Sequence, residues 1–159
     1  LEFRRVLFRS PDGACLVSAG DRGLLRLWDC SSGSELRALR GHQGRVFSCV
    51  FSPDGARLAS AGEDGTLRLW DCASGAELHA LRGHRSSVLS CAFSPDGLRL
   101  ASSGQDGTLR LWDCSSGAAV GVKSAHEGRV WSCAFSPDGG QLASAGSGAA
   151  LRIWDLIQG

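Results

Sequence analysis

The nine residues DGTLRLWDC occupy positions 64–72 and recur without change at positions 106–114, a spacing of 42 residues. The same step relates four Trp-Asp pairs, four Ser-Pro-Asp-Gly turns and three histidines. The pairs begin at Trp28, Trp70, Trp112 and Trp154; the turns begin at Ser10, Ser52, Ser94 and Ser136; the histidines are His42, His84 and His126. Three series in phase indicate an internal repeat, and the repeat decides how the rest of the chain is interpreted.

Within one unit the apolar residues alternate with a period of two, which predicts β-strands and no helix. The expected strands are 45–52, 57–62, 66–71 and 76–82. Ser-Pro-Asp-Gly suits a type I turn between the first two strands, and Asp-Gly suits the tight hairpin between the next two. Each unit is therefore predicted to be a four-stranded antiparallel meander.

A four-stranded sheet with apolar residues on both faces has to pack against copies of itself. The combined pattern GH…VxxCxFSPDGxxLASxGxDGTLRLWD, which covers roughly residues 10–155, resembles the WD-repeat family of β-propellers. The resemblance implies an all-β fold in which four-stranded antiparallel blades, with a 42-residue period, surround a central channel.

Closed propellers of this family most often have seven blades, which at this period would need roughly 290 residues. The chain has 159, so we expect a propeller fragment whose open blade edges promote self-association. The expected units are an incomplete blade at 11–40, complete units at 41–82 and 83–124, and a unit at 125–159 that lacks its last strand.

The first ten residues, LEFRRVLFRS, do not fit the repeat. The register places Arg4 and Arg9 at the positions of Val46 and Phe51, and burying unpaired guanidinium groups is costly. The stretch also matches the translation of a common short-read sequencing adapter. We therefore predict that residues 1–10 are a non-native segment; the alternative is a basic tail that supplies the missing fourth strand of the last unit.

The composition, with 43% hydrophobic and 21% charged residues and a formal charge of +1, is that of a globular protein. Residues 1–10 carry three arginines and one glutamate, so the remainder has 14 basic and 15 acidic residues, which argues against nucleic-acid binding. No apolar run approaches a membrane span. Six of the seven cysteines follow the repeat, which favours free thiols and a cytoplasmic or nuclear protein. We expect no cofactor, metal or small-molecule substrate.

Each middle unit contains a histidine, a serine and an aspartate, the residue types of a hydrolytic triad. The set recurs from unit to unit, the serine lies within a strand, and nothing marks an oxyanion hole, so we favour a structural role. In propellers that this sequence resembles, such residues and the motif Trp form a buried hydrogen-bond relay. The resemblance assigns the relay to His42, Ser60, Asp64 and Trp70, and to His84, Ser102, Asp106 and Trp112. The first and last units have Arg22 and Gly148 at the aspartate position, so we expect them to be less stable.

In related propellers, partner contacts cluster at the start of the first strand and just before the hairpin aspartate. Carried over by position, the candidate partner-binding residues are Asp21, Arg45, Phe47, Glu63, Ser87, Leu89, Gln105, Arg129, Trp131 and Ser147. They combine apolar anchors with charges, as interface hot spots do. The alternative is that Phe47, Leu89 and Trp131 simply line the channel.

These features predict a non-enzymatic scaffold that binds protein or peptide partners on the top face of the propeller. The alternative is a sensor or docking module of a larger signalling NTPase or kinase whose catalytic domain lies outside this sequence. No phosphate-binding loop, kinase signature or metal motif occurs within the 159 residues.

Overall fold

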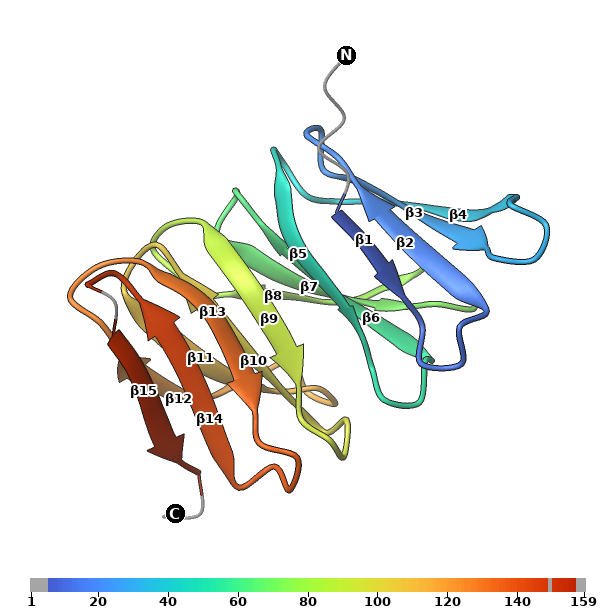
Figure 1. Cartoon of the computed structure of the whole chain (residues 1–159). Helices are drawn as coiled ribbons and strands as arrows, with labels where there is room; N and C mark the ends of the chain where they lie inside the picture. The colour runs from blue at the N-terminus through green and yellow to red at the C-terminus, as the bar shows by residue number, and fades with distance from the viewer. Residues whose placement is uncertain (1–5, 149, 157–159) are drawn as a thin grey trace.

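The computed structural model describes residues 6–148 and 150–156, which form fifteen β-strands in four antiparallel sheets and no helix (Figure 1). The first sheet contains β1 (Val6–Arg9), β2 (Cys15–Ala19), β3 (Leu24–Asp29) and β4 (Glu35–Arg40). The second contains β5 (Val46–Phe51), β6 (Arg57–Gly62), β7 (Thr66–Asp71) and β8 (Glu77–Arg82). The third contains β9 (Val88–Phe93), β10 (Arg99–Gly104), β11 (Thr108–Asp113) and β12 (Ala119–Ser124). In the described residues the fourth sheet contains three strands, β13 (Val130–Phe135), β14 (Gln141–Gly146) and β15 (Ala150–Asp155).

Turn chemistry sets the joints between the strands. In the turn after β5 the Ser52 hydroxyl and the Ala56 N–H both donate to the Asp54 carboxylate, and Gly55 has a φ of 72°. A side chain at this positive φ would be strained, which explains the glycine. The same turn recurs at Gly13, Gly97 and Gly139, so each sheet is a meander of neighbouring strands.

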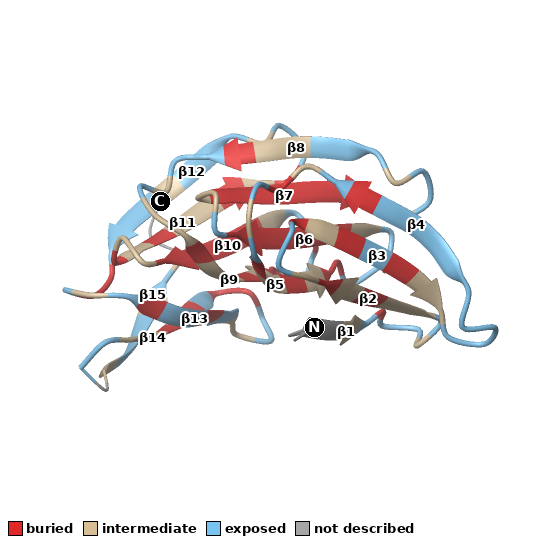
Figure 2. Cartoon of the chain, turned by 90° about the horizontal axis from the view of Figure 1, so that it is seen from above, coloured by how far each residue is buried: buried red, intermediate tan, exposed pale blue. Residues whose placement is uncertain are grey.

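The four sheets fan out around their inner strands, which contact one another from β1 to β5, β5 to β9 and β9 to β13. Figure 2 shows the outer strands β4, β8 and β12 along the outside of the arc, mostly exposed, with buried residues concentrated in the second and third sheets. This is the all-β arrangement of propeller blades that the repeat predicts.

Three apolar clusters lie between successive sheets, and each joins the same two kinds of face. Between the second and third sheets, Leu67 and Leu69 of β7 meet Phe93 and Trp112 of the next sheet. Between the first and second sheets, Leu25 and its neighbours on β3 meet residues that include Trp70. Every sheet thus has one face of small residues and leucines and another that carries the aromatic residues, and unlike faces pack together.

The outer faces of the first and fourth sheets have no described sheet against them. Leu151 and Ile153 of β15 are 70% and 61% exposed, whereas Leu67 and Leu69 at the same repeat positions are fully buried. On the first sheet, Trp28 is only half-buried, although Trp70 and Trp112 are buried. The described sheets therefore form an open arc with two unlike ends: the fourth sheet exposes Leu151 and Ile153, and the first sheet carries Trp28.

Strand β1 occupies the place of a first strand in the first sheet, which differs from the incomplete blade expected at 11–40. It pairs with β2 in the repeat register, so that Phe8 lies opposite Val17 as Val50 lies opposite Ala59. Arg9 is exposed. The cost of burying a guanidinium group does not arise for Arg9, because its face of the sheet is not covered by another described sheet; Arg4 lies outside the described residues. The non-native origin of residues 1–10 stays a prediction.

At the edge that carries the Ser-Pro-Asp-Gly turns, arginines connect neighbouring sheets. Arg57 donates to the carbonyl oxygen of Gly97 at 2.8 Å, and Arg99 donates to that of Gly139 at 3.4 Å. All seven cysteines are free thiols. The described residues include no helix that could cross a membrane.

Candidate functional site at the hairpin edge

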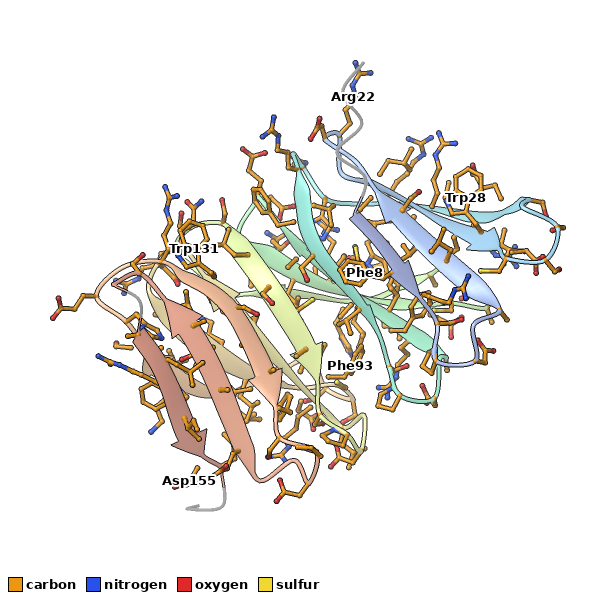
Figure 3. All side chains as sticks on the ribbon, in the orientation of Figure 1. Phe8, Arg22, Trp28, Phe93, Trp131 and Asp155 are labelled. Atoms are coloured by element: carbon orange, nitrogen blue, oxygen red, sulfur yellow. The ribbon has the colours of Figure 1, made fainter. Side chains whose placement is uncertain are left out.

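One edge of the sheets gathers the residues that the repeat singles out. We call it the hairpin edge: here β5, β9 and β13 begin, and here the second and third strands of each sheet turn. Figure 3 shows Trp131 and Arg22 at this edge and Asp155 at the opposite one. The opposite edge carries the Ser-Pro-Asp-Gly turns.

In the second sheet the structure brings the predicted relay residues into contact in one chain. Trp70 Nε1 donates to Ser60 Oγ at 2.9 Å, and Ser60 Oγ lies 2.8 Å from His42 Nε2. The other ring nitrogen, His42 Nδ1, lies 3.1 Å from both oxygens of Asp64. The relay therefore runs from the aromatic face of the sheet to the hairpin.

The hydrogen bonds of this relay all donate in the same direction, from Trp70 toward Asp64. An indole N–H can only donate, so Ser60 Oγ accepts from Trp70. An ionised carboxylate can only accept, so we infer that His42 carries its hydrogen on Nδ1 and donates it to Asp64, which leaves Nε2 to accept the Ser60 hydroxyl hydrogen. A chain of this kind strengthens each of its hydrogen bonds, and each buried group has a partner.

Burial and hydrogen bonding set the protonation of the relay. Burial lowers the pKa of His42, and the opposing effect of Asp64 does not restore it to the ordinary value of 6.5. Burial alone would raise the pKa of Asp64, but the Gln43 N–H, the Thr66 hydroxyl and N–H, and His42 together lower it further than burial raises it. A neutral histidine therefore donates to an ionised carboxylate.

The third sheet repeats this geometry with His84, Ser102, Asp106 and Trp112. The contact from His84 Nε2 to Ser102 Oγ is 2.8 Å, and that from His84 Nδ1 to Asp106 is 3.0 Å. Burial would raise the pKa of Asp106, but the hydrogen bonds from the Arg85 N–H and the Thr108 hydroxyl, together with His84, lower it to about 2.

The first and fourth sheets keep only part of the relay. Trp28 donates to Ser18 at 2.8 Å, but Arg22 stands at the acid position and is exposed. In the fourth sheet, Trp154 and His126 both contact Ser144 at 3.0 Å, and Gly148 stands at the acid position.

The relay serines are not placed as nucleophiles. Ser60 and Ser102 are fully buried, and each already accepts from a tryptophan. A hydrolytic serine has to reach a substrate carbonyl. The geometry thus favours a structural role for the relay, which holds the hairpin against the sheet.

The structure places the three predicted apolar anchors at β-bulges. The pairing between the first two strands skips one residue in each of these sheets, and the skipped residues are Phe47, Leu89 and Trp131. A bulge re-aims a side chain away from the regular alternation. Trp131 is 51% exposed, and Phe47 and Leu89 are half-buried. All three thus leave the sheet cores at equivalent positions.

Polar contacts run along the same edge from the first sheet to the third. Arg45 Nε lies 3.3 Å from Asp21 Oδ1, and the Arg45 N–H donates to the Glu63 carboxylate at 2.9 Å. Ser87 Oγ in turn donates to the Glu63 carbonyl at 3.2 Å. These four predicted residues thus form one continuous series.

The remaining predicted residues lie on the third and fourth sheets. The Gln105 side chain accepts from the Ser86 hydroxyl at 3.3 Å, and the Ser147 N–H donates to the Arg129 carbonyl at 2.8 Å. The Arg129 guanidinium lies over the Trp131 ring, 5.4 Å from its centre. None of the ten predicted partner-binding residues is buried.

A shallow, open pocket of about 260 Å³ lies at this edge between the second and third sheets. Its lining includes Glu63, Asp64, His84, Arg85 and Ser87. Arg85, an exposed cation in this pocket, was missed by the sequence reasoning; its signal is its place directly after the relay histidine. Among the described residues no group of three or more His, Cys, Asp or Glu side chains is arranged to hold a metal ion.

The packing of these sheets defines the class: blades of a repeat propeller, stacked face to face about common inner strands. The family model described as WD domain, G-beta repeat matches residues 7–29, 33–71, 75–113 and 117–155. The chain belongs to the WD-repeat family, whose repeats generally serve as protein-interaction scaffolds. Each full match includes the outer strand of one sheet and the first three strands of the next.

Shorter stretches are similar to WD repeat and SOCS box-containing protein 1 of three vertebrates. Identity to the Homo sapiens protein is 47% over 53 residues, which is 32% of this chain and 13% of that protein. The Mus musculus protein is 44% identical over 54 residues, 33% of this chain. The Xenopus tropicalis protein is 45% identical over 53 residues, 32% of this chain. In each case the match spans 13% of the relative's length.

Replacing the relay acid tests its contribution to stability. We expect Asp64→Ala to lower the free energy of unfolding by about 1–3 kcal/mol, because His42 Nδ1 loses its buried partner. Urea unfolding followed by tryptophan fluorescence measures the change. The matched control is Asp71→Ala, which removes the half-buried acid of a Trp-Asp pair; this acid accepts from the Ser74 N–H in the turn that follows. A loss for Asp64→Ala no larger than for Asp71→Ala would contradict the relay.

The same relay predicts how stability varies with pH. The folded pKa values of His42 and His84 lie below 6.5, so the unfolded chain binds protons more readily and stability declines as pH falls below about 6.5. Asp106 adds a second loss as pH falls from 3.8 toward about 2. Urea midpoints measured across a pH series should therefore decrease on acidification. Stability that increases between pH 7 and 5 would refute this prediction.

Proposed function

We propose that this chain is a non-enzymatic scaffold that binds a protein or peptide segment across the hairpin edge. The observation that carries the proposal is the set of three β-bulges, which place Phe47, Leu89 and Trp131 at equivalent positions outside the sheet cores. A segment lying across the inner strands would meet these side chains in sequence.

Charge and shape support this surface as a recognition site. The series from Asp21 through Arg45 and Glu63 to Ser87 is exposed or half-buried, and it ends at the pocket between the second and third sheets. Exposed aromatic and arginine side chains are enriched at interface hot spots. Arg129 and Trp131 form such a pair on the fourth sheet.

The proposed absence of catalysis rests on the relay. The two sets of His, Ser and Asp are repeated, and both serines are buried within sheets. The relatives are named for WD repeats together with a SOCS box. This pairing fits a role for such repeats as an interaction module.

We further propose that two copies of this chain associate through their end sheets. The exposed face of the fourth sheet carries Leu151 and Ile153, whose counterparts in the other sheets pack against an aromatic face. The first sheet leaves its aromatic face uncovered around Trp28. The proposed contact therefore continues, between molecules, the packing that occurs three times within one.

Peptide selection tests the binding surface. Short random peptides displayed on phage are selected on the wild-type chain, and their affinities are then measured for Trp131→Ala, Arg45→Glu and Leu98→Ala. We expect the first two variants to bind about tenfold more weakly, because each removes a hot-spot side chain. Leu98, 62% exposed beside the Ser-Pro-Asp-Gly turn of the third sheet, is the control. Equal affinities for all three would reject the hairpin edge.

Sedimentation velocity tests the association of end sheets. Leu151→Lys combined with Ile153→Lys should shift the wild-type chain from dimers or larger species toward monomers, because charges replace the exposed apolar face. The control pair, Val120→Lys with Val122→Lys, alters two exposed valines on the outer strand β12. A wild-type chain that is monomeric throughout, or a control pair with the same effect, would contradict the contact.

A further inference from the structure

The fourth sheet keeps the relay histidine but has no acid for it. His126 is 7% exposed, its Nε2 lies 3.0 Å from Ser144 Oγ, and Ser144 accepts from Trp154 at 3.0 Å. The buried Nδ1 atom has no hydrogen-bond partner among the described residues. Gly148 stands where Asp64 and Asp106 stand in the intact relays.

This atom is a buried polar group without a partner among the described residues, whichever ring nitrogen carries the hydrogen. Trp154 can only donate to Ser144, whose oxygen can either donate to His126 Nε2 or accept from it. When Ser144 donates, as the relay serines do in the intact sheets, Nδ1 carries a hydrogen that a carboxylate can accept. A buried polar atom without a partner is unfavourable, and each such group in a native structure calls for an explanation.

The position of the missing acid is open, and an arginine holds the repeat position that lies near the acid in the second sheet. In the second sheet, Arg68 Nη2 lies 3.9 Å from the Asp64 carboxylate. Arg152 holds the equivalent repeat position in β15, where it donates to the Ala125 carbonyl at 2.7 Å. Gly148 is exposed, and outside its chain neighbours no atom lies within 4 Å of the point where a Cβ would be.

We propose that this end of the fourth sheet is a carboxylate-binding site in which His126 Nδ1–H and Arg152 receive an acid supplied from outside the sheet. The ligand is a carboxylate because a carboxylate occupies this place in the second and third sheets, and because a histidine donor and a guanidinium both match it. The site lies at the hairpin edge, where the end of β14 pairs with the start of β13 through Gly146 and Val130.

Two sources share this chemistry. One is a small free carboxylate. The other is an aspartate or glutamate of a segment bound across the hairpin edge, and only this second source rests on the proposed scaffold function. In either case the exposed Glu127, directly after His126, opposes the ligand by its charge.

Formate is the probe for the site itself. Heteronuclear NMR of the histidine ring nitrogens should show a saturable shift at His126 when the full chain is titrated with formate, and none with sodium chloride. Glu127→Gln should strengthen formate binding by about twofold, because it removes an opposing surface charge. Formate should also raise the melting temperature of the wild-type chain by roughly 1–3 °C.

Two further variants serve as matched controls. Replacing Gly148→Asp, Ala149→Gly and Ala150→Thr together restores the hairpin sequence of residues 106–108, and it should abolish the formate response. Asp106→Gly creates the same vacancy in the third sheet, and we expect formate to stabilise it through His84. No shift at His126 with formate, or an equal shift in the restored variant, would overturn the proposal.

The selected peptides identify the source of the acid. If acidic peptide residues supply it, changing them to amides weakens binding to the wild-type chain but not to the restored variant. If the wild-type chain and the restored variant lose affinity equally, the peptide is excluded as the source of the acid, and a free carboxylate is the remaining source. Failure to select any peptide rejects the scaffold function, whereas the formate titration supports or overturns the carboxylate site independently of that outcome.

Discussion

The contact between unlike sheet faces is the constraint on which the rest of the structure depends. Each sheet covers its neighbour's leucines and alanines with tryptophan, phenylalanine and cysteine side chains, and this contact is repeated three times. Because apolar burial is the main favourable term in folding, a single sheet of this composition could not stand alone. Stacking fixes the position of the inner strands, and these in turn determine where the hairpin edge lies.

The relay provides hydrogen-bond partners for the polar groups that this stacking removes from water. A hairpin that crosses the end of a buried sheet brings backbone and side-chain donors out of water, and those donors need acceptors. In the second sheet, Asp64 accepts from His42, from the Thr66 hydroxyl and from the Gln43 and Thr66 N–H groups. A single carboxylate therefore ties together the loop, the hairpin and the strand. Where the acid is missing, as beside His126, the buried ring nitrogen has no partner among the described residues.

The repeat predicts the fold, because the 42-residue period places turns, strands and faces in the same order each time. It also predicts which residues meet in the relay, since a residue's role follows from its position in the unit. It does not predict the exposure of Arg9, which depends on whether another sheet covers that face. The sequence analysis also missed the bulges. In a regular strand buried residues are two positions apart, but Val46 and Cys49 are three apart, and this spacing indicates the bulge; Cys49 and Phe51 return to a spacing of two.

The bulges separate what the surface displays from what the fold requires. A residue left out of the pairing contributes little to the sheet cores, so Phe47, Leu89 and Trp131 differ widely in size while the strands around them keep the same register. Evolution or design can therefore vary these positions one sheet at a time without repacking the interior. New binding preferences can therefore arise when different side chains are combined at these three positions while the strands stay the same.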